Sequence, residues 1–411
     1  MTSKTIFIFL LLFVGSLKAV TLEESYKAAL RNMESIKRAS AVVEQTKELK
    51  SQAIAAVLPN VSGVGSYTKI DPPNGAGASP FLLTRQYSAA IRLTQPLIRG
   101  GLVSAYQLAE ENILLAKFQA ETTAFNLYQL VINSYFNLAL AGLDVKNLEE
   151  LLKFSRERVR EIRERTKIGR SRKGELVEAE AQLHIAESQV KQAMITLDQA
   201  RKTFAFYTDL DPEKIVVPDS IPDLKGSVDE YVSRIKTRPD ILAAEQQIQV
   251  ADQQVKIAKG GHYPQVDLTS NYYLDRTGVL ETSEWDVGVA VVIPLFQGGS
   301  VQSQVRQAVQ EKRIAQLNSS ETQRAAARDV KISYQNILQI KEQLKSLRSA
   351  LSKAEEAYRL NKKDYQYGLV TNLDVLQSLN VFIETKRSYD GLIAIGNLNF
   401  RNLQALTGVL P

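Results

Sequence analysis

Two regions of the chain alternate apolar residues with polar or small ones, which is the period of a β-strand with two different faces. In residues 60–97 the odd positions of both strands, such as Val61, hold apolar residues or glycine, whereas even positions, such as Ser62, are mostly small or polar. Residues 265–295 repeat this alternation on both sides of a loop. The pattern predicts one β-hairpin in each region, with an apolar and a polar face.

The segments that follow the two hairpins have a longer apolar period. In residues 100–207 and 299–407, apolar residues recur every seven positions, with a second set three residues behind the first. This heptad spacing is typical of coiled coils. Gly169 and Gly368 interrupt the heptads, so each region is predicted to form an antiparallel coiled-coil hairpin. Its first helix would extend for roughly 100 Å, at about 1.5 Å per residue.

A shorter helical pattern precedes each β-hairpin, over residues 22–57 and 228–259. These patterns end next to Pro59 and Pro264, and the residue before a proline is disfavoured in helical geometry. We therefore predict one continuous helix before each hairpin, which ends where the first strand begins.

The order helix, β-hairpin and coiled-coil hairpin occurs twice. From Tyr135 and Tyr334 onward, equivalent residues stay 199 positions apart, and so long a period indicates a duplicated domain. We place the first repeat at residues 20–211 and the second at residues 228–411. The proline-rich segment 212–227 is predicted to be a linker on the flank of the helices.

The N-terminal segment and the predicted strands together indicate a membrane location. Residues 1–19 combine Lys4, an apolar run and small residues, the pattern of a secretory signal peptide. No later apolar stretch approaches 20 residues, so a spanning part would have to consist of strands. Four aromatic residues near the loop ends of the strands are expected at the membrane interface, namely Tyr67, Tyr87, Tyr272 and Trp285. A solvent-covered hairpin on a soluble domain is the alternative interpretation.

Two hairpins provide four strands, which are too few to close a barrel. Several chains would therefore have to associate. With 7% aromatic residues in 411 and a high content of charged residues, the composition favours long helices. The fold class we expect is mainly α, with a small transmembrane β part.

Charge and reactive side chains exclude several functions. The net charge is +6, but acidic and basic residues alternate and no recognition motif accompanies them, so we expect no nucleic-acid binding. The chain has no cysteine, and His184 and His262 each lack a second ligand at a usable spacing. The glycine pairs at 100–101 and 298–299 lack the lysine and hydroxyl of a phosphate loop, and are predicted to be bends between strand and helix. We expect no enzymatic activity, no cofactor and no metal site.

Four short sequence motifs are similar to those of a known family. They are Gly-His-Tyr-Pro-Gln-Val-Asp-Leu at 261–268, Pro-Leu-Phe-Gln-Gly-Gly-Ser at 294–300, Tyr-Gln-Tyr-Gly at 365–368 and Leu-Asp-Val-Leu at 373–376. With these motifs and the duplicated organisation, the chain resembles the TolC-like outer-membrane efflux proteins over residues 21–411. The resemblance implies a homotrimer that pools twelve strands into a barrel in the outer membrane and twelve helical segments into a periplasmic tunnel. It also implies a passive conduit, fed by an inner-membrane RND or ABC transporter through a periplasmic adaptor protein.

The resemblance further implies a gate at the periplasmic end. Asp374 matches the first acid of the family's pore constriction, while the second position is Gln377. Tyr365 and Glu175 match a tyrosine and an acid of the family's closing lock, whose arginine position is Val370 here. We hypothesise that one of two nearby arginines, Arg170 or Arg172, replaces the missing arginine as the partner of Glu175. The alternative for Asp374 is a solvated carboxylate at a helix start.

Basic residues concentrate near the glycine that interrupts the first coiled coil. We expect the two hairpin tips to dock on an acidic adaptor surface, with four candidate contact residues: Gly169, Gly368, Arg165 and Lys167. A solvated helical face with internal ion pairs explains the same charges equally well. The competing function is a soluble periplasmic coiled-coil adaptor or scaffold, but that reading needs an additional small domain for which the chain has no room.

Overall fold

The computed structural model describes residues 20–71, 85–211, 215–278 and 280–408, and the predicted signal peptide at residues 1–19 lies outside them. The chain divides into two compact units. Among the described residues, the helical unit lies within Met1–Ile36, Ala124–Ile235 and Ala326–Pro411, and the sheet unit lies within Lys37–Thr123 and Lys236–Ala325. Two long helices, α3 (Leu102–Lys167) and α7 (Ser300–Gln366), contribute residues to both.

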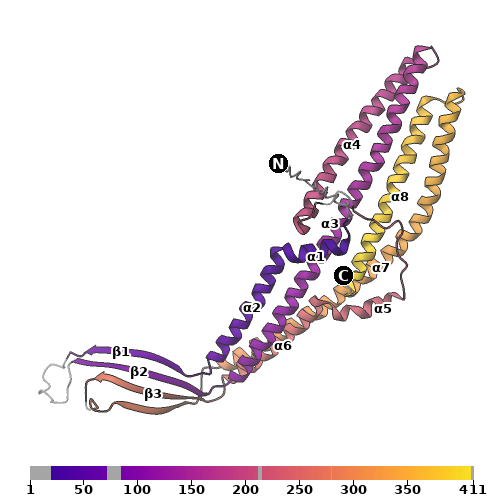
Figure 1. Ribbon diagram of the computed structural model, residues 1–411. Coiled ribbons are helices and arrows are strands. Elements are labelled where there is room, and N and C mark those ends of the chain that lie inside the picture. Colours follow the sequence, from indigo (N-terminus) through magenta and orange to yellow (C-terminus); the bar gives the residue numbers. More distant parts are fainter. Residues whose placement is uncertain (1–19, 72–84, 212–214, 279, 409–411) are drawn as a thin grey trace, which may run out of the picture. The chain divides into compact units, whose positions relative to one another are not determined.

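The sheet unit contains one antiparallel sheet, in which the two predicted hairpins lie side by side (Figure 1). Its strands follow the order β1-β2-β3-β4 and span Asn60–Lys69, Arg85–Ile98, Gln265–Arg276 and Trp285–Val292. Strands β2 and β3 pair directly and so join the two repeats. Strands β1 and β4 are the two edges of the sheet within the described residues.

The strand register gives this sheet two different faces. Residues directly opposite one another in neighbouring strands point to the same face. Apolar residues meet on one face, where Leu268 lies opposite Val289. Polar residues meet on the other face, where Ser62 lies opposite Arg92. The predicted alternation of an apolar and a polar face is therefore confirmed.

The turn from β2 into α3 crosses the end of α6 (Pro239–Gly260) at very close range. A Cβ atom added to Gly100 would lie 1.9 Å from the carbonyl oxygen of Gly260. Gly101 has a φ of +84°, which only glycine adopts without strain. The first glycine pair thus forms a bend between strand and helix, as predicted, and two backbones touch there with no room for a side chain.

The helical unit is built from two antiparallel hairpins, α3 with α4 (Lys173–Thr208) and α7 with α8 (Asn372–Leu406), which run beside each other (Figure 1). Residues at heptad positions form its core, including Val145 and Leu152 of α3 and Val190 of α4. The core also contains residues of α7 and α8. Burial of these apolar stripes holds the two repeats together, because an isolated helix of this length would leave its stripe in water.

The helices before the two β-hairpins are broken, and the predicted continuous helices over residues 22–57 and 228–259 are wrong. The structure has α1 (Leu22–Asn32) and α2 (Glu34–Ala55) in the first repeat, and α5 (Val228–Ser233), a 3-10 turn (Arg234–Thr237) and α6 in the second. Met33 leaves the helix with extended backbone angles. Arg238 is extended because Pro239 follows it and occupies the first turn of α6.

Equivalent tyrosines of the two repeats hold the linker and its surroundings on the helical unit. The Tyr135 hydroxyl of α3 lies 2.8 Å from the Val216 carbonyl oxygen, and the Tyr334 hydroxyl of α7 donates to the Gly226 carbonyl oxygen at 3.1 Å. Burial raises the pKa of Tyr135 to about 12, so its hydroxyl stays protonated near neutral pH. The described linker residues, 215–227, are therefore fixed by duplicated contacts.

Candidate functional site at the tips of the helical hairpins

The two hairpin tips share one backbone design. At the end of α3 the Arg170 N–H donates to the Arg165 carbonyl oxygen at 2.8 Å, around Gly169 with a φ of +72°. At the end of α7 the Leu369 N–H donates to the Asp364 carbonyl oxygen at 3.1 Å. Both are six-residue C-terminal turns that require a left-handed residue, usually glycine. The glycine interruptions of the heptads thus set where each hairpin turns.

An open pocket of about 750 Å³ lies between the two tips. Predicted site residues from distant parts of the sequence line it together: Arg165, Arg170, Arg172, Glu175, Tyr365, Gly368, Val370, Asp374 and Gln377. The tertiary structure therefore collects the predicted constriction, lock and part of the predicted docking residues at one place. Gly169 and Lys167 are exposed residues of the first tip and do not line this pocket.

Tyr365 and Glu175 are in contact. The Tyr365 hydroxyl donates to Glu175 Oε2 at 3.1 Å. Ser171 donates to the same carboxylate oxygen and lies 3.3 Å from the Tyr365 hydroxyl. A hydroxyl–carboxylate hydrogen bond is stronger than one between neutral groups. This cluster joins the end of α7, in the second repeat, to the start of α4, in the first.

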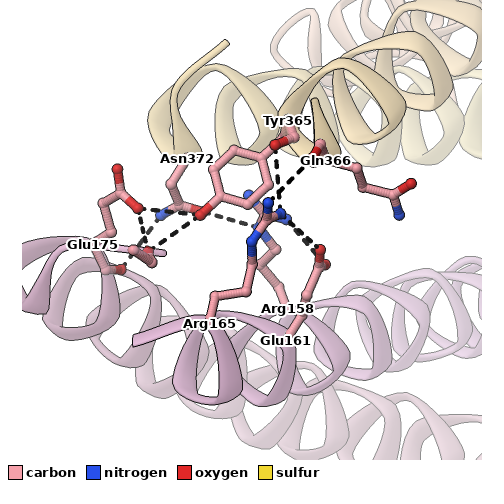
Figure 2. A network of polar contacts seen from close by, with 8 residues as sticks. Arg158, Glu161, Arg165, Glu175, Tyr365, Gln366 and Asn372 are labelled. Atoms are coloured by element: carbon pink, nitrogen blue, oxygen red, sulfur yellow. Dashed lines mark hydrogen bonds and ion pairs between the residues drawn. The ribbon is translucent and has the colours of Figure 1, made fainter. Parts of the chain in front are cut away.

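The ring of Tyr365 is also held between two arginines of α3 (Figure 2). The guanidinium carbon of Arg158 lies 3.8 Å from the ring centroid and that of Arg165 lies 4.7 Å from it. Arg165 also donates to the carbonyl oxygen of Gln366 at 3.2 Å. A cation over an aromatic face is attracted by the ring quadrupole, most strongly where water is excluded. The end of α7 is therefore bound to α3 by cations as well as by packing.

Arg158 is buried at the centre of these contacts, with 5% of its surface exposed. Its Nε donates to Oδ1 of Asn372 at 2.9 Å, and its Nη1 donates to Glu161 at 3.1 Å. Its Nη2 is buried and forms no hydrogen bond within the described part of the chain. Asn372, which is fully buried, donates in turn to the Glu175 carbonyl oxygen at 3.4 Å. Arg158 and Asn372 thus connect the ends of all four long helices (Figure 2).

The contacts of the Glu175 carboxylate come from Ser171 and Tyr365, and not from its predicted partners. Arg170 and Arg172 are exposed, and among the described residues neither forms an ion pair with Glu175. The physical reason is the glycine turn, which carries both residues past the end of α3 and away from its buried side. Val370 lies in the second turn and lines the pocket without contributing a charge. The cations that approach Tyr365 instead come from inside α3.

Asp374 has the capping role that was the alternative interpretation of this residue. It is the third residue of α8, and the N–H and hydroxyl of Thr371 donate to its Oδ2 at 2.8 and 2.6 Å. Both hydrogen bonds lower the pKa of Asp374, and the bond from the Thr371 hydroxyl has the larger effect. Asp374 is exposed and lines the pocket beside Gln377. A capping carboxylate can therefore also present negative charge at the tip.

The basic residues of the first tip are partly paired within the chain. Lys167 forms an ion pair with Glu164 at 2.8 Å, and Arg163 forms one with Glu180 at 2.9 Å. Arg165, expected at a docking surface, is turned toward the second hairpin. Arg170 and Arg172 are exposed beside these pairs, so the first tip keeps a basic surface.

The predicted interface aromatics lie in cross-strand pairs. Tyr67 is opposite Tyr87 in β1 and β2, and Tyr272 is opposite Trp285 in β3 and β4. All four are exposed on the apolar face. Tyr272 lies opposite Ile91, four residues from Tyr87 along β2, so the two pairs stand at different levels of the sheet. Their place at a membrane interface stays a prediction.

Two residues of the tip were misjudged or missed by sequence reasoning. Arg158 belongs to the basic residues near Gly169 and received no role of its own, although it directly precedes Val159 of the heptad seam. Its position beside the apolar stripe was the available signal. Asn372 had no such signal, because a residue at a helix start is ordinarily exposed. Within the described residues, no cluster of three or more possible metal ligands occurs, and none of the helices is long and apolar enough to cross a membrane.

Comparison with known proteins identifies the family. The sequence matches the family model described as outer membrane efflux protein over residues 25–208 and 231–388. It is 23% identical to the outer membrane efflux protein BepC of Brucella suis, over 88% of this chain and 79% of BepC. It is also 23% identical to the outer membrane protein TolC of Escherichia coli, over 96% of this chain and 85% of TolC.

A likeness in fold accompanies the likeness in sequence. The crystal structure of the CmeC outer membrane channel of Campylobacter jejuni superposes with a TM-score of 0.81 at 18% identity, over 94% of this chain and 85% of that one. The predicted fold class, mainly helical with a four-stranded sheet, is confirmed. Since the family model spans most of the sequence and the fold agrees with it, the chain belongs to the outer membrane efflux protein family.

Proposed function

We propose that this protein is the outer-membrane channel of a tripartite export system, in which three copies form a passive conduit. The observation that carries the proposal is the sheet of this member of the outer membrane efflux family. Among the described residues it has one apolar face, one polar face and two unpaired edges. An unpaired strand edge is unfavourable in lipid. Association of three chains through β1 and β4 would remove every edge and close twelve strands around a polar lumen.

The energy for transport would come from its partners. The chain belongs to the outer membrane efflux protein family. We therefore place an inner-membrane RND or ABC transporter and a periplasmic adaptor upstream of the channel. The basic first tip is suited to an acidic adaptor surface, because opposite charges guide encounter and orientation.

The gate is assigned to the hairpin tips. In the resting state, Tyr365, Glu175 and the α3 arginines hold the two hairpins together, while Asp374 and Gln377 face the pocket between them. Opening requires the hairpins to separate at this end. The tip contacts would then break while the hydrophobic core along the helices persists.

A charge placed on either face of the sheet tests the membrane part of this proposal. Val289→Arg on the apolar face should reduce insertion into the outer membrane strongly, since an arginine facing lipid costs about 2–4 kcal/mol near the bilayer centre. Thr269→Arg, on the polar face, is the matched control and should insert normally. Insertion is measured by outer-membrane fractionation and by the conductance of purified trimers in planar bilayers. A water-soluble wild-type monomer without conductance, or equal insertion of both variants, would refute the proposed barrel.

The constriction at Asp374 predicts a pH dependence. Because folding lowers the pKa of Asp374, its charge and its contribution to stability are complete above the ordinary carboxyl pKa and are lost only as the pH falls through the lowered value. Thr371→Val removes the hydroxyl that donates to Asp374 and should raise this pKa. The pH at which trimers lose cation selectivity in planar bilayers should therefore move upward.

Thr385→Val is the control for the Thr371 variant. Thr385 is a partly exposed threonine of α8 whose hydroxyl donates to the Val381 carbonyl oxygen, and its replacement should leave the selectivity profile unchanged. If the profile of Thr371→Val coincides with the wild type, Asp374 does not set the selectivity.

A further inference from the structure

Four polar residues form one continuous row across the polar face of the sheet. Ser62 lies opposite Arg92, Arg92 opposite Asn271, and Asn271 opposite Asp286. Each strand contributes one member, and the row crosses β2 and β3 near their middle. We name these four residues the charged row.

The charges of this row are fixed in place by neutral side chains. Arg92 Nε donates to Asn271 Oδ1 at 2.8 Å, and Asn271 Nδ2 donates to Asp286 Oδ1 at 2.8 Å. The Tyr273 hydroxyl donates to the other oxygen of Asp286 at 2.8 Å. One amide thus bridges a cation and an anion that stand two strands apart. The amide between them keeps the guanidinium and the carboxylate out of direct contact, so the two charges do not form an ion pair.

The charged pair nearer the helices differs in this respect. Arg99 and Asp267 form a direct ion pair at 3.3 Å, so their fields largely cancel. Arg92 and Asp286 both remain exposed while their orientation is restrained. The other face of the sheet is apolar and has a low dielectric constant. Charges held in fixed positions beside such a medium act on passing ions more strongly than mobile charges at an ordinary protein surface.

We propose that Arg92 and Asp286 are opposing charge-selectivity determinants of the channel lumen, in the sheet and separate from the gate at the tips. This inference rests on the proposed trimeric channel, in which the polar face lines the lumen. Each trimer then carries three fixed cations and three fixed anions at one level. The cations favour permeating anions and the anions favour permeating cations, so wild-type selectivity at this level reflects their balance.

The test is the reversal potential of full-length trimers in planar bilayers under a salt gradient. All chains carry Asp374→Asn and Arg158→Ala, so that the tip neither adds its own charge nor remains narrow. Arg92→Gln should shift permeability toward cations, and Asp286→Asn should shift it toward anions. Each shift should be about two- to fivefold in the cation-to-anion ratio, as expected for a unit charge a few ångströms from an ion in water. The double variant should return to the starting ratio.

Two further variants separate charge from structure. Arg92→Lys keeps the charge without the fork of donors and should keep the starting selectivity. Lys69→Gln removes one positive charge from β1 on the other face and should change nothing. Channels that conduct but shift in neither single variant, or an Arg92→Lys variant that behaves like Arg92→Gln, overturn the charged row as a determinant. Absence of conductance in every chain refutes the proposed channel itself.

Discussion

Arg158→Ala is expected to open the channel at its periplasmic tips. In planar bilayers, purified trimers of this variant should spend a much larger fraction of time in an open state than wild-type trimers. Cells that produce the variant should also become permeable to large antibiotics normally excluded by the outer membrane. We expect a change of about 5- to 150-fold in the ratio of open to closed channels, which corresponds to about 1–3 kcal/mol.

This magnitude follows from the burial of the groups that Arg158 contacts. Without the guanidinium, the fully buried Asn372 loses the donor to its Oδ1, and an unsatisfied buried polar atom costs about 1–3 kcal/mol. Tyr365 loses the closer of its two cations. Both losses occur only while the hairpins are together. Separated hairpins expose the same groups to water, so the closed state is destabilised selectively.

Arg160→Ala is the matched control for this experiment. It removes the same charge from the same helix, but Arg160 is exposed, and its replacement should leave gating unchanged. Arg158→Lys retains the charge but cannot reach Asn372 and Glu161 with a planar fork, so it should open less often than Arg158→Ala. If the control and Arg158→Ala open equally, loss of tip charge and not the buried contact controls the gate.

Gly100→Ala is expected to prevent assembly of the sheet unit. The added methyl group would lie 1.9 Å from the carbonyl oxygen of Gly260, and the obstacle is backbone, which cannot rotate away as a side chain can. Overpacking in a close-packed region costs about 1–3 kcal/mol and sometimes more. We expect the upper end or beyond, because α3 and α6 must move apart together. The measurement is the yield of heat-resistant trimers in the outer-membrane fraction.

Gly63→Ala provides the control for this prediction. Gly63 lies in β1, and a Cβ atom added there would have no neighbour within 4 Å, so trimer yield should match the wild type. A normal yield of Gly100→Ala trimers would mean that the close crossing of Gly100 and Gly260 does not exist in the assembled protein.

Local rules explain which parts of the tip were predictable. A glycine between two heptad patterns is a local signal, and Gly169 and Gly368 do form the expected turns. Asp374 follows a threonine by three residues, which is the spacing of a capping box, and this contact is present. The partner of Tyr365 was not local. Its nearest cation belongs to Arg158, more than two hundred residues earlier, and only the register of α3 against α7 determines that contact.

The sequence by itself determined the elements and their duplication. Periods of two and seven residues distinguish strands from coiled-coil helices because side chains alternate across a strand and recur along one stripe of a helix. The same pattern predicted the apolar and the polar face of the sheet, because the face to which a side chain points depends only on its position in the alternation along its own strand. The break at Met33 escaped it, since one extended residue hardly changes a periodic pattern. The break at Arg238 had a local signal, Pro239, which periodicity alone does not use.

Only the tertiary structure decided which elements became neighbours and which charges were buried. Pairing of β2 with β3 joins strands from different repeats and thereby creates the charged row, whose members are scattered in the sequence. Packing of the two hairpins placed Arg158 inside and left Arg170 and Arg172 outside. All three are arginines in one basic stretch. Their different environments arise because a cation is buried only where an aromatic ring, a carboxylate and an amide converge to replace water.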